Sequence, residues 1–170
     1  MTGKDFGIKW LAYGLALLPV WFLHSFVFNR FPVWGAIPML LPLAAVAVAT
    51  LEGALAGAGY GLAVGMLMDA VLPGPGGMMS FALAAVGFGA GLLAQFVLRQ
   101  DLVGCLVCSA LSLCVIDLFH ILPRLFLGQA PLVPMLELAG RELGWSLVFV
   151  PPVYLLYHWV YDRVPKATVL

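Results

Sequence analysis

Few side chains in this 170-residue chain could do acid–base chemistry within its apolar stretches. The sequence "DLFHILPR" places Asp117, His120 and Arg124 within about 60° of one another on a helix. Ionisable residues at membrane depth are costly and usually face the protein interior or water. This polar cluster could relay a proton, line a ligand pocket or contact a partner. It could equally form an internal salt bridge that orients the helix, and the sequence leaves both interpretations open.

Asp69 is a second isolated charge, at the end of the apolar run that begins at Gly53. A carboxylate near a helix C-terminus meets the unfavourable end of the helix dipole, so it needs compensation. A Gly/Pro turn containing Pro75 and Gly76 follows, and the first N–H groups of the next helix, from Gly76 to Met78, have no helical partners. We expect Asp69 to accept these groups and fix a hairpin. The alternative is a site for a substrate, a proton or a partner.

The cysteines and histidines give little indication of a metal or redox site. Cys105 and Cys108, in "CLVC", have the spacing of such a pair, but no second pair or nearby charge accompanies them. With Cys114 they lie in one apolar run, where small, weakly polar residues can pack. His24 and His158 lie near opposite ends of their runs, and dispersed histidines do not predict a zinc site. We therefore expect no metal, no cofactor and no enzymatic activity.

Composition predicts the environment that must position these residues. The chain is 64% hydrophobic and 9% charged, with a mean hydropathy of +1.08, which indicates a membrane protein. Its net charge of zero gives no basic surface for nucleic acid. A bilayer core about 30 Å thick requires roughly 20 apolar residues of helix. We predict an all-α, polytopic bundle of six transmembrane helices with short loops, a single membrane domain over 1–170, with spans at 10–28, 33–51, 53–72, 77–98, 102–122 and 143–161.

The segment 123–142 is the longest connection between these spans. Its apolar residues recur at three- and four-residue spacing, which predicts a helix along the outer membrane interface. Pro151 and Pro152 should kink the last span. With six spans, five basic residues lie on the side of the termini and three on the other. Because basic residues are more frequent on the cytoplasmic side, both termini are predicted to be cytoplasmic. The five are Lys4, Lys9, Arg99, Arg163 and Lys166, and the three are Arg30, Arg124 and Arg141.

Small residues predict where two helices touch. In lipid, helices associate through close approach, which small residues at four-residue spacing allow. The third run and the fourth run each carry such a row, so we expect them to pack as a tight hairpin. The eight residues are Gly53, Gly57, Gly61 and Gly65 in the third run, and Ser80, Ala84, Gly87 and Gly91 in the fourth.

These residues resemble the core signature of the MreD family of bacterial rod shape-determining membrane proteins. That family carries a glycine-spaced third span ending in G-(L/M)-L-x-D, followed by a P-L-G-type turn. The matching positions are Gly61, Gly65, Met66, Leu67 and Asp69, then Pro75 and Gly76. The turn reads "PGPGG", which departs from the family pattern.

The resemblance implies a non-catalytic scaffold of the cell-elongation machinery in the bacterial inner membrane. It implies direct association with MreC and, through the complex, with MreB and with the wall-synthesising glycosyltransferase and transpeptidase. It also implies an architecture similar to the substrate-binding subunits of energy-coupling-factor vitamin transporters.

Two transport functions are alternatives. A vitamin-binding subunit would dock its transport module through an A-x-x-x-A pattern such as Ala12 and Ala16. A proton-coupled transporter would need Asp117 or Glu52 to titrate. The vitamin pocket would be built from outer residues: Asn29, Arg30, Trp34, Arg124 and Gln129.

Overall fold

The computed structural model describes residues 3–28, 30, 37–71, 77–97, 101–126 and 132–164. For Gly3, Lys4, Val71, Pro123 and Arg124 it describes the backbone alone. The described residues form helices and no strands, which confirms the all-α class. The elements are α1 (Gly3–Phe22) with a π-helical continuation η1 (Leu23–Phe28), α2 (Leu40–Glu52), α3 (Ala54–Val71), α4 (Met78–Phe96), α5 (Leu102–Phe126), α6 (Leu132–Val148) and α7 (Val150–Arg163).

Three of the described helical stretches are long and apolar enough to cross a membrane: Asp5–Phe28, Met78–Phe96 and Leu102–Leu122. A fourth is added if α6 and α7, which meet at 43°, form one bent span. The 13 residues of α2 extend only about 20 Å, less than a bilayer core of about 30 Å. The protein is therefore a helical membrane protein with three or four candidate spans among its described residues.

Of the predicted spans 33–51 and 102–122, the first differs from the structure at its start. The predicted span 33–51 starts too early, because Ile37–Met39 are not helical and α2 begins at Leu40. Pro38 explains part of this, since a proline disfavours the helical conformation of the residue before it. The predicted span 102–122 coincides with the candidate span Leu102–Leu122, although the helix that carries it, α5, continues to Phe126.

The last predicted span, 143–161, belongs to a longer bent rod. Helix α6 already begins at Leu132, and the rod breaks at Phe149 before continuing as α7. Pro151 and Pro152 lie in the first turn of α7, where a missing N–H costs little. The predicted kink is thus present, immediately before the two prolines.

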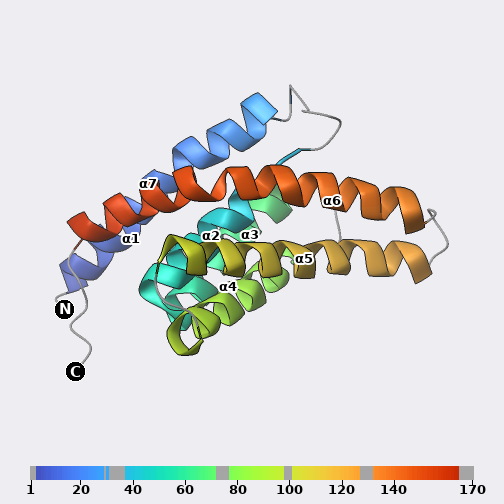
Figure 1. The fold of residues 1–170 in the computed structure, drawn as a ribbon. Coiled ribbons are helices and arrows are strands. Elements are labelled where there is room, and N and C mark those ends of the chain that lie inside the picture. The colour runs from blue at the N-terminus through green and yellow to red at the C-terminus, as the bar shows by residue number, and fades with distance from the viewer. Residues whose placement is uncertain are drawn as a thin grey trace.

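Helix α2 forms the centre of the molecule, with α3, α4, α5 and α7 packed around it (Figure 1). Every residue from Leu40 to Leu51 is buried. Gly53, at φ +96°, joins α2 to α3 through a single residue, and the two helices fold back on each other. The hydrophobic core is therefore built around a short helix that has no lipid-facing side.

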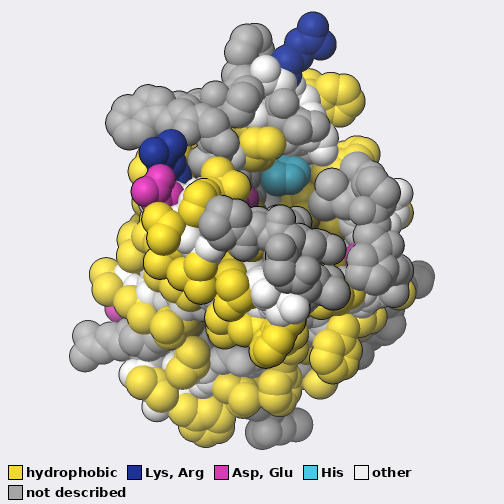
Figure 2. All heavy atoms as spheres, turned by 90° about the vertical axis from the view of Figure 1, so that its right-hand side faces the viewer, with side chains coloured by type: hydrophobic (Ala, Val, Ile, Leu, Met, Phe, Trp, Pro, Cys, Tyr) yellow, Lys and Arg dark blue, Asp and Glu magenta, His cyan; other side chains and the backbone are white. Residues whose placement is uncertain are grey.

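Helix α1 lies against α7 and α2 at the edge of this core. The start of α1 and the end of α7 lie at the same end of the molecule (Figure 1). The outer face of α1 is apolar, with Phe6, Leu11 and Leu15 each more than half exposed. Hydrophobic side chains also cover most of the described surface at the opposite end (Figure 2). Such a surface fits an apolar solvent and not water.

Candidate functional site

Helices α3 and α4 pack backbone against backbone along the predicted rows of small residues. A Cβ atom at Gly61 would lie 2.3 Å from the carbonyl oxygen of Leu83, and one at Gly65 would lie 2.4 Å from the Cα of Ser80. No real Cβ contact is so short, so only glycine fits these two positions while the backbones keep this separation. Ala84 contributes its backbone nitrogen to the surface that faces Gly61.

The same contact continues toward the other end of α3. A Cβ atom at Gly87 would lie 2.3 Å from the carbonyl oxygen of Gly57, and one at Gly91 would lie 2.4 Å from the Cα of Ala54. Gly57 is also confined from the side of α2, where the Cβ of Ala49 would lie 2.4 Å away. Gly57 is therefore a point at which three helices meet, with only the methyl group of Ala49 between them.

Gly53 differs from the other members of its row. It does not lie within α3 but is the positive-φ joint that ends α2, and the side-chain amide of Gln95 lies against it. A residue with a side chain would be strained there by the backbone conformation as well as by the contact. The four-residue repeat thus contains a turn glycine and three packing glycines.

Asp69 caps the N-terminus of α4 from the neighbouring helix. One of its carboxylate oxygens accepts the Met79 N–H at 3.2 Å, and the other accepts the Ser80 N–H at 2.9 Å and the Ser80 hydroxyl at 2.5 Å. The N-cap residue itself, Gly77, has no side chain to perform this role. The carboxylate thus satisfies orphan donors of α4 and gains the favourable end of its dipole.

The donors lie slightly later in the chain than the sequence predicts. The two shortest N–H contacts come from Met79 and Ser80, whereas the expectation named Gly76, Gly77 and Met78; of these, the Gly77 N–H also interacts with the carboxylate. Gly77 takes a left-handed conformation at φ +88°, which places the next two residues in the first turn of α4. Pro75 and Gly76, which belong to the predicted hairpin site, lie outside the described residues.

The predicted polar cluster on α5 is divided between different environments. Asp117 is buried, with only 9% of its surface exposed, whereas His120, one turn later, is exposed. Arg124 lies in α5, but its side chain is outside the described part of the chain. The sequence also did not indicate that α6, which carries the half-buried Glu142, packs against α5.

A buried ion pair that the sequence did not predict joins α1 to the end of α2. The ammonium group of Lys9 donates to one carboxylate oxygen of Glu52, and the Tyr13 hydroxyl donates to the other at 2.8 Å. Both charged side chains are at least nine-tenths buried. Lys9 and Tyr13 are four residues apart and so share a helix face, which is the only sequence feature that could have suggested the pair.

Tyrosine side chains extend this network across the bundle. The Tyr60 hydroxyl of α3 donates to the Tyr13 carbonyl at 3.1 Å, and its oxygen lies 2.7 Å from the Tyr157 hydroxyl of α7. The Tyr13 and Tyr157 rings stack at 6.1 Å. The Tyr157 side chain is fully buried. The network therefore ties α1, α3 and α7 to Glu52.

At the other end of α2, two side chains hold the segment that precedes the helix. The Nδ1 atom of His24 lies 3.1 Å from the Pro38 carbonyl oxygen, and the Ser146 hydroxyl accepts the Met39 N–H at 2.9 Å. Ser146 is fully buried on α6. Helix α2, which has no side-chain cap of its own, is thus capped by α6.

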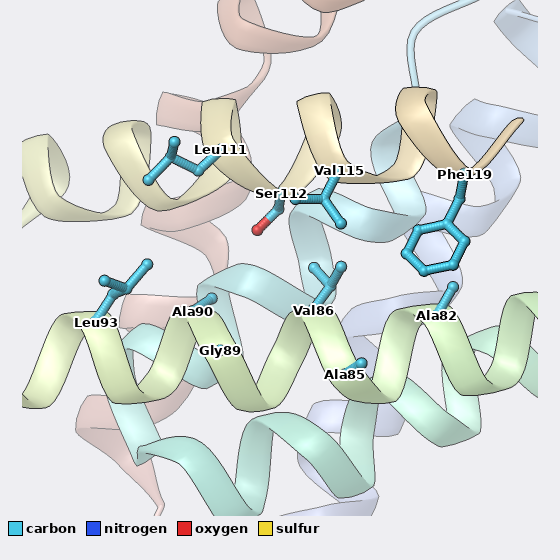
Figure 3. A pocket seen from close by; sticks show the side chains of 10 residues that line it. All are labelled: Ala82, Ala85, Val86, Gly89, Ala90, Leu93, Leu111, Ser112, Val115 and Phe119. Carbon is cyan, nitrogen blue, oxygen red and sulfur yellow. The ribbon is translucent and has the colours of Figure 1, made fainter. Parts of the chain in front are cut away.

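A cavity of about 190 Å³ lies between α4 and α5 (Figure 3). Small residues of α4, among them Ala85, Gly89 and Ala90, form one wall, and Leu111, Val115 and Phe119 of α5 form the other. Ser112 is the one polar side chain among its lining residues, and its hydroxyl points toward α4 (Figure 3). The lining offers no charged group that could bind a polar substrate.

The described residues provide no group of three or more metal-ligating side chains. Cys108 donates to the Ala90 carbonyl at 3.6 Å, and Cys105 lies 4.0 Å from the Ser109 hydroxyl, so both pack within the helix bundle. Of the residues expected in a vitamin pocket, the structure describes the side chain of Arg30 alone; Asn29, Trp34 and Gln129, and the side chain of Arg124, lie outside the described part. Comparisons with family models, with curated proteins and with solved structures gave no match to this chain.

Proposed function

We propose that this protein is a non-catalytic membrane scaffold of the MreD type, which supports rod shape and lateral wall synthesis by binding MreC. The observation that carries the proposal is the α3–α4 hairpin. The residues that resemble the family signature, Gly61, Gly65 and Asp69, are the ones that make its backbone contacts and its cap. Residues that pack two helices together and cap one of them favour a rigid structural element over a catalytic site.

The proposal includes a location and a topology. The chain would lie in the bacterial inner membrane with both termini in the cytoplasm. It would cross six times, with the short helices α2 and α3 counted as crossings and α2 shielded from lipid by its neighbours. The burial of α2 along its whole length supports this, because a helix surrounded by protein does not need to match the thickness of the bilayer.

The partners would bind through helix surfaces. Helix α1 exposes a row of large apolar side chains and packs only at the edge of the core, so a transmembrane helix of MreC could lie against such a face. MreB, the glycosyltransferase and the transpeptidase would be reached through the complex.

The closest alternative is a substrate-binding subunit of a vitamin transporter, and the environment of α1 speaks against it. The A-x-x-x-A pair would have to face outward to dock a transport module. Ala16 is instead buried, at 6% exposure, and Ala12 packs against the core. This pair is therefore used inside the molecule.

Purification in mild detergent, with identification of the co-isolated proteins, tests the proposal. We expect MreC to be recovered with the intact protein and to be lost from a Gly61→Leu variant, whose hairpin cannot close. A Gly59→Leu variant is the matched control, since a Cβ atom there meets nothing within 4 Å. Recovery of transporter ATPases in place of MreC would overturn the scaffold function.

A further inference from the structure

The cavity between α4 and α5 is flanked by two candidate membrane spans, Met78–Phe96 and Leu102–Leu122. Its lining residues run from Ala82 to Leu93 on α4 and from Leu111 to Phe119 on α5, so they lie inside both spans. At this depth the surroundings of the protein are hydrocarbon and not water. Any molecule that enters the cavity from the surroundings must therefore be soluble in the bilayer.

The cavity is open on its outer side and closed on its inner side. Leu111 is 50% exposed and Val115 is 42% exposed, and Ala85 on the opposite wall is exposed as well. Val86 and Ala90 of α4 are buried. A molecule dissolved in the bilayer can therefore enter between the two helices while both stay folded.

The space exists because α4 carries small residues on two of its faces. On the face toward α3, glycine is required at Gly87 and Gly91 by the close contact of the two backbones. On the face toward α5, a Cβ atom at Gly89 would meet nothing within 4 Å. Packing against the described residues thus does not require a glycine at Gly89, and the room beside it is left unfilled.

One polar side chain borders the cavity. Ser112 is only 6% exposed, and its hydroxyl points toward α4 (Figure 3). It makes no hydrogen bond to any residue that the structure describes. Every wholly enclosed side-chain oxygen or nitrogen among those residues has a partner, so the Ser112 oxygen must border open space, and that space is the cavity.

These properties define the chemistry of an occupant. A buried water needs two to four polar partners, and the lining side chains supply one. A hydroxyl without a partner in apolar surroundings is costly, so hydrocarbon alone does not satisfy the site either. An apolar cavity of about 150 Å³ holds a molecule of the size of benzene. The 190 Å³ of this cavity therefore suit a ring of that size with a small substituent.

We propose that the α4–α5 cavity binds a neutral, membrane-soluble molecule through a ring-sized hydrocarbon group that carries one hydrogen-bond-accepting oxygen. The hydrocarbon lies against Ala85, Gly89 and Val115, and the oxygen accepts the hydrogen bond from the Ser112 hydroxyl. A charged ligand is excluded because the lining has no opposite charge. A transmembrane helix is about 10 Å across, so it is too wide to enter. The site does not depend on the scaffold function.

Two small molecules of the same shape test the site. Acetophenone has a ring and one carbonyl oxygen, and α-methylstyrene has a methylene group in place of that oxygen. The melting temperature of the full-length protein in detergent is measured against the concentration of each, corrected for its partition into micelles. We expect both to stabilise the protein and acetophenone to bind roughly fivefold more tightly, the factor that corresponds to one neutral hydrogen bond.

Three variants assign the binding to this cavity. Ser112→Ala removes a single oxygen and should bind the two molecules equally. Gly89→Leu adds a large side chain to the α4 wall and should largely remove the response to both. Gly59→Leu makes the same change on α3, where a Cβ atom also meets nothing within 4 Å, and should respond as the wild type does. If Gly89→Leu does not fold, Ser112→Ala decides the question alone.

Two results would overturn the proposal. Equal affinities of the wild type for acetophenone and α-methylstyrene would mean that Ser112 does not contact the ligand. The absence of stabilisation by either molecule would mean that the cavity takes no such ligand. If Gly89→Leu then lost a co-isolated membrane protein that Gly59→Leu retained, the occupant would be a side chain of a partner helix.

Discussion

Asp69 makes three hydrogen bonds to the first turn of α4, and its substitutions separate the roles of shape and charge. Asn keeps one acceptor oxygen, so Asp69→Asn should melt slightly below the wild type, whereas Asp69→Leu removes all acceptance and should melt well below it. Thermal unfolding in detergent measures both. Glu137→Gln, exposed on α6, is the control for loss of an acidic charge and should have no effect.

The same two variants address whether the carboxylate has a further role in cells. If the cap is its whole function, Asp69→Asn should accumulate in the membrane and support rod shape, and Asp69→Leu should be scarce. The measurement is cell shape scored beside membrane abundance. An abundant but inactive Asp69→Asn protein would show that the charge itself is required, for example by a partner.

The buried pair of Lys9 and Glu52 predicts strong non-additivity. Lys9→Met leaves Glu52 buried without its cation, which should cost about 3–5 kcal/mol, whereas the double variant Lys9→Met, Glu52→Gln should recover most of that loss. A double-mutant cycle on unfolding free energies measures the coupling. Additive effects of the two single changes would contradict the assignment of the pair as a buried, mutually dependent unit.

At this scale the sequence predicts partners that are near in the chain and misses those that are distant. The acceptance of α4 donors by Asp69 is predictable because a hairpin brings the two together within a dozen residues. Lys9 and Glu52 are 43 residues apart, and the Met39 N–H and its acceptor Ser146 are 107 residues apart. Nothing in either local pattern indicates which helix supplies the opposing group.

Among the elements, the α3–α4 hairpin gives the most direct test of packing. Gly61→Ala places a methyl group 2.3 Å from a backbone oxygen that has no room to move, and it should destabilise the protein by about 1–3 kcal/mol. Gly59→Ala, two residues away on the same helix, meets nothing and should be neutral or stabilising by roughly 0.5–1 kcal/mol through helix propensity.

Thermal unfolding of the two alanine variants in the same detergent provides the comparison. Equal melting temperatures would mean that α3 and α4 do not touch in the detergent-solubilised protein. Because the two substitutions are chemically identical, differences in helix propensity or expression cannot account for a selective loss at Gly61.

The bounds of the elements were predicted with unequal success for a physical reason. Apolar runs bounded by Gly/Pro turns, such as α4, are located to within two residues of the predicted range 77–98. In contrast, hydrophobicity does not distinguish a helix that crosses lipid from one buried in protein, so α2 was predicted too long. A helix was predicted within 123–142 and is present from Leu132, but its continuation to Val148 as the first half of a bent rod with α7 was not predicted, because 132–142 has the composition of a surface segment.

For the molecule as a whole, the side of the membrane on which each end lies can be tested by cysteine labelling. The experiment uses intact spheroplasts that contain a cysteine-free variant of the protein with one cysteine added. A cysteine at Gly3 or at Thr168 should be shielded from an impermeant reagent, and one at Gly128 should be labelled. The adjacent placement of the start of α1 and the end of α7 agrees with termini on one side (Figure 1). Labelling at either terminal position would reject the orientation.

The tyrosine contact between α3 and α7 has a consequence for the order of events during synthesis. Helices α2, α3 and α4 are consecutive, so their mutual contacts can form as soon as they leave the ribosome, at a small cost in loop closure. Tyr60 and Tyr157 are 97 residues apart, so the network that fixes α1 stays incomplete until nearly the whole chain has been made. A cysteine at Ala84 should then become shielded from alkylation in nascent chains halted shortly after α4, whereas one at Tyr13 should stay reactive until α7 has entered the membrane. The first helix to be synthesised would thus be the last to find its final place.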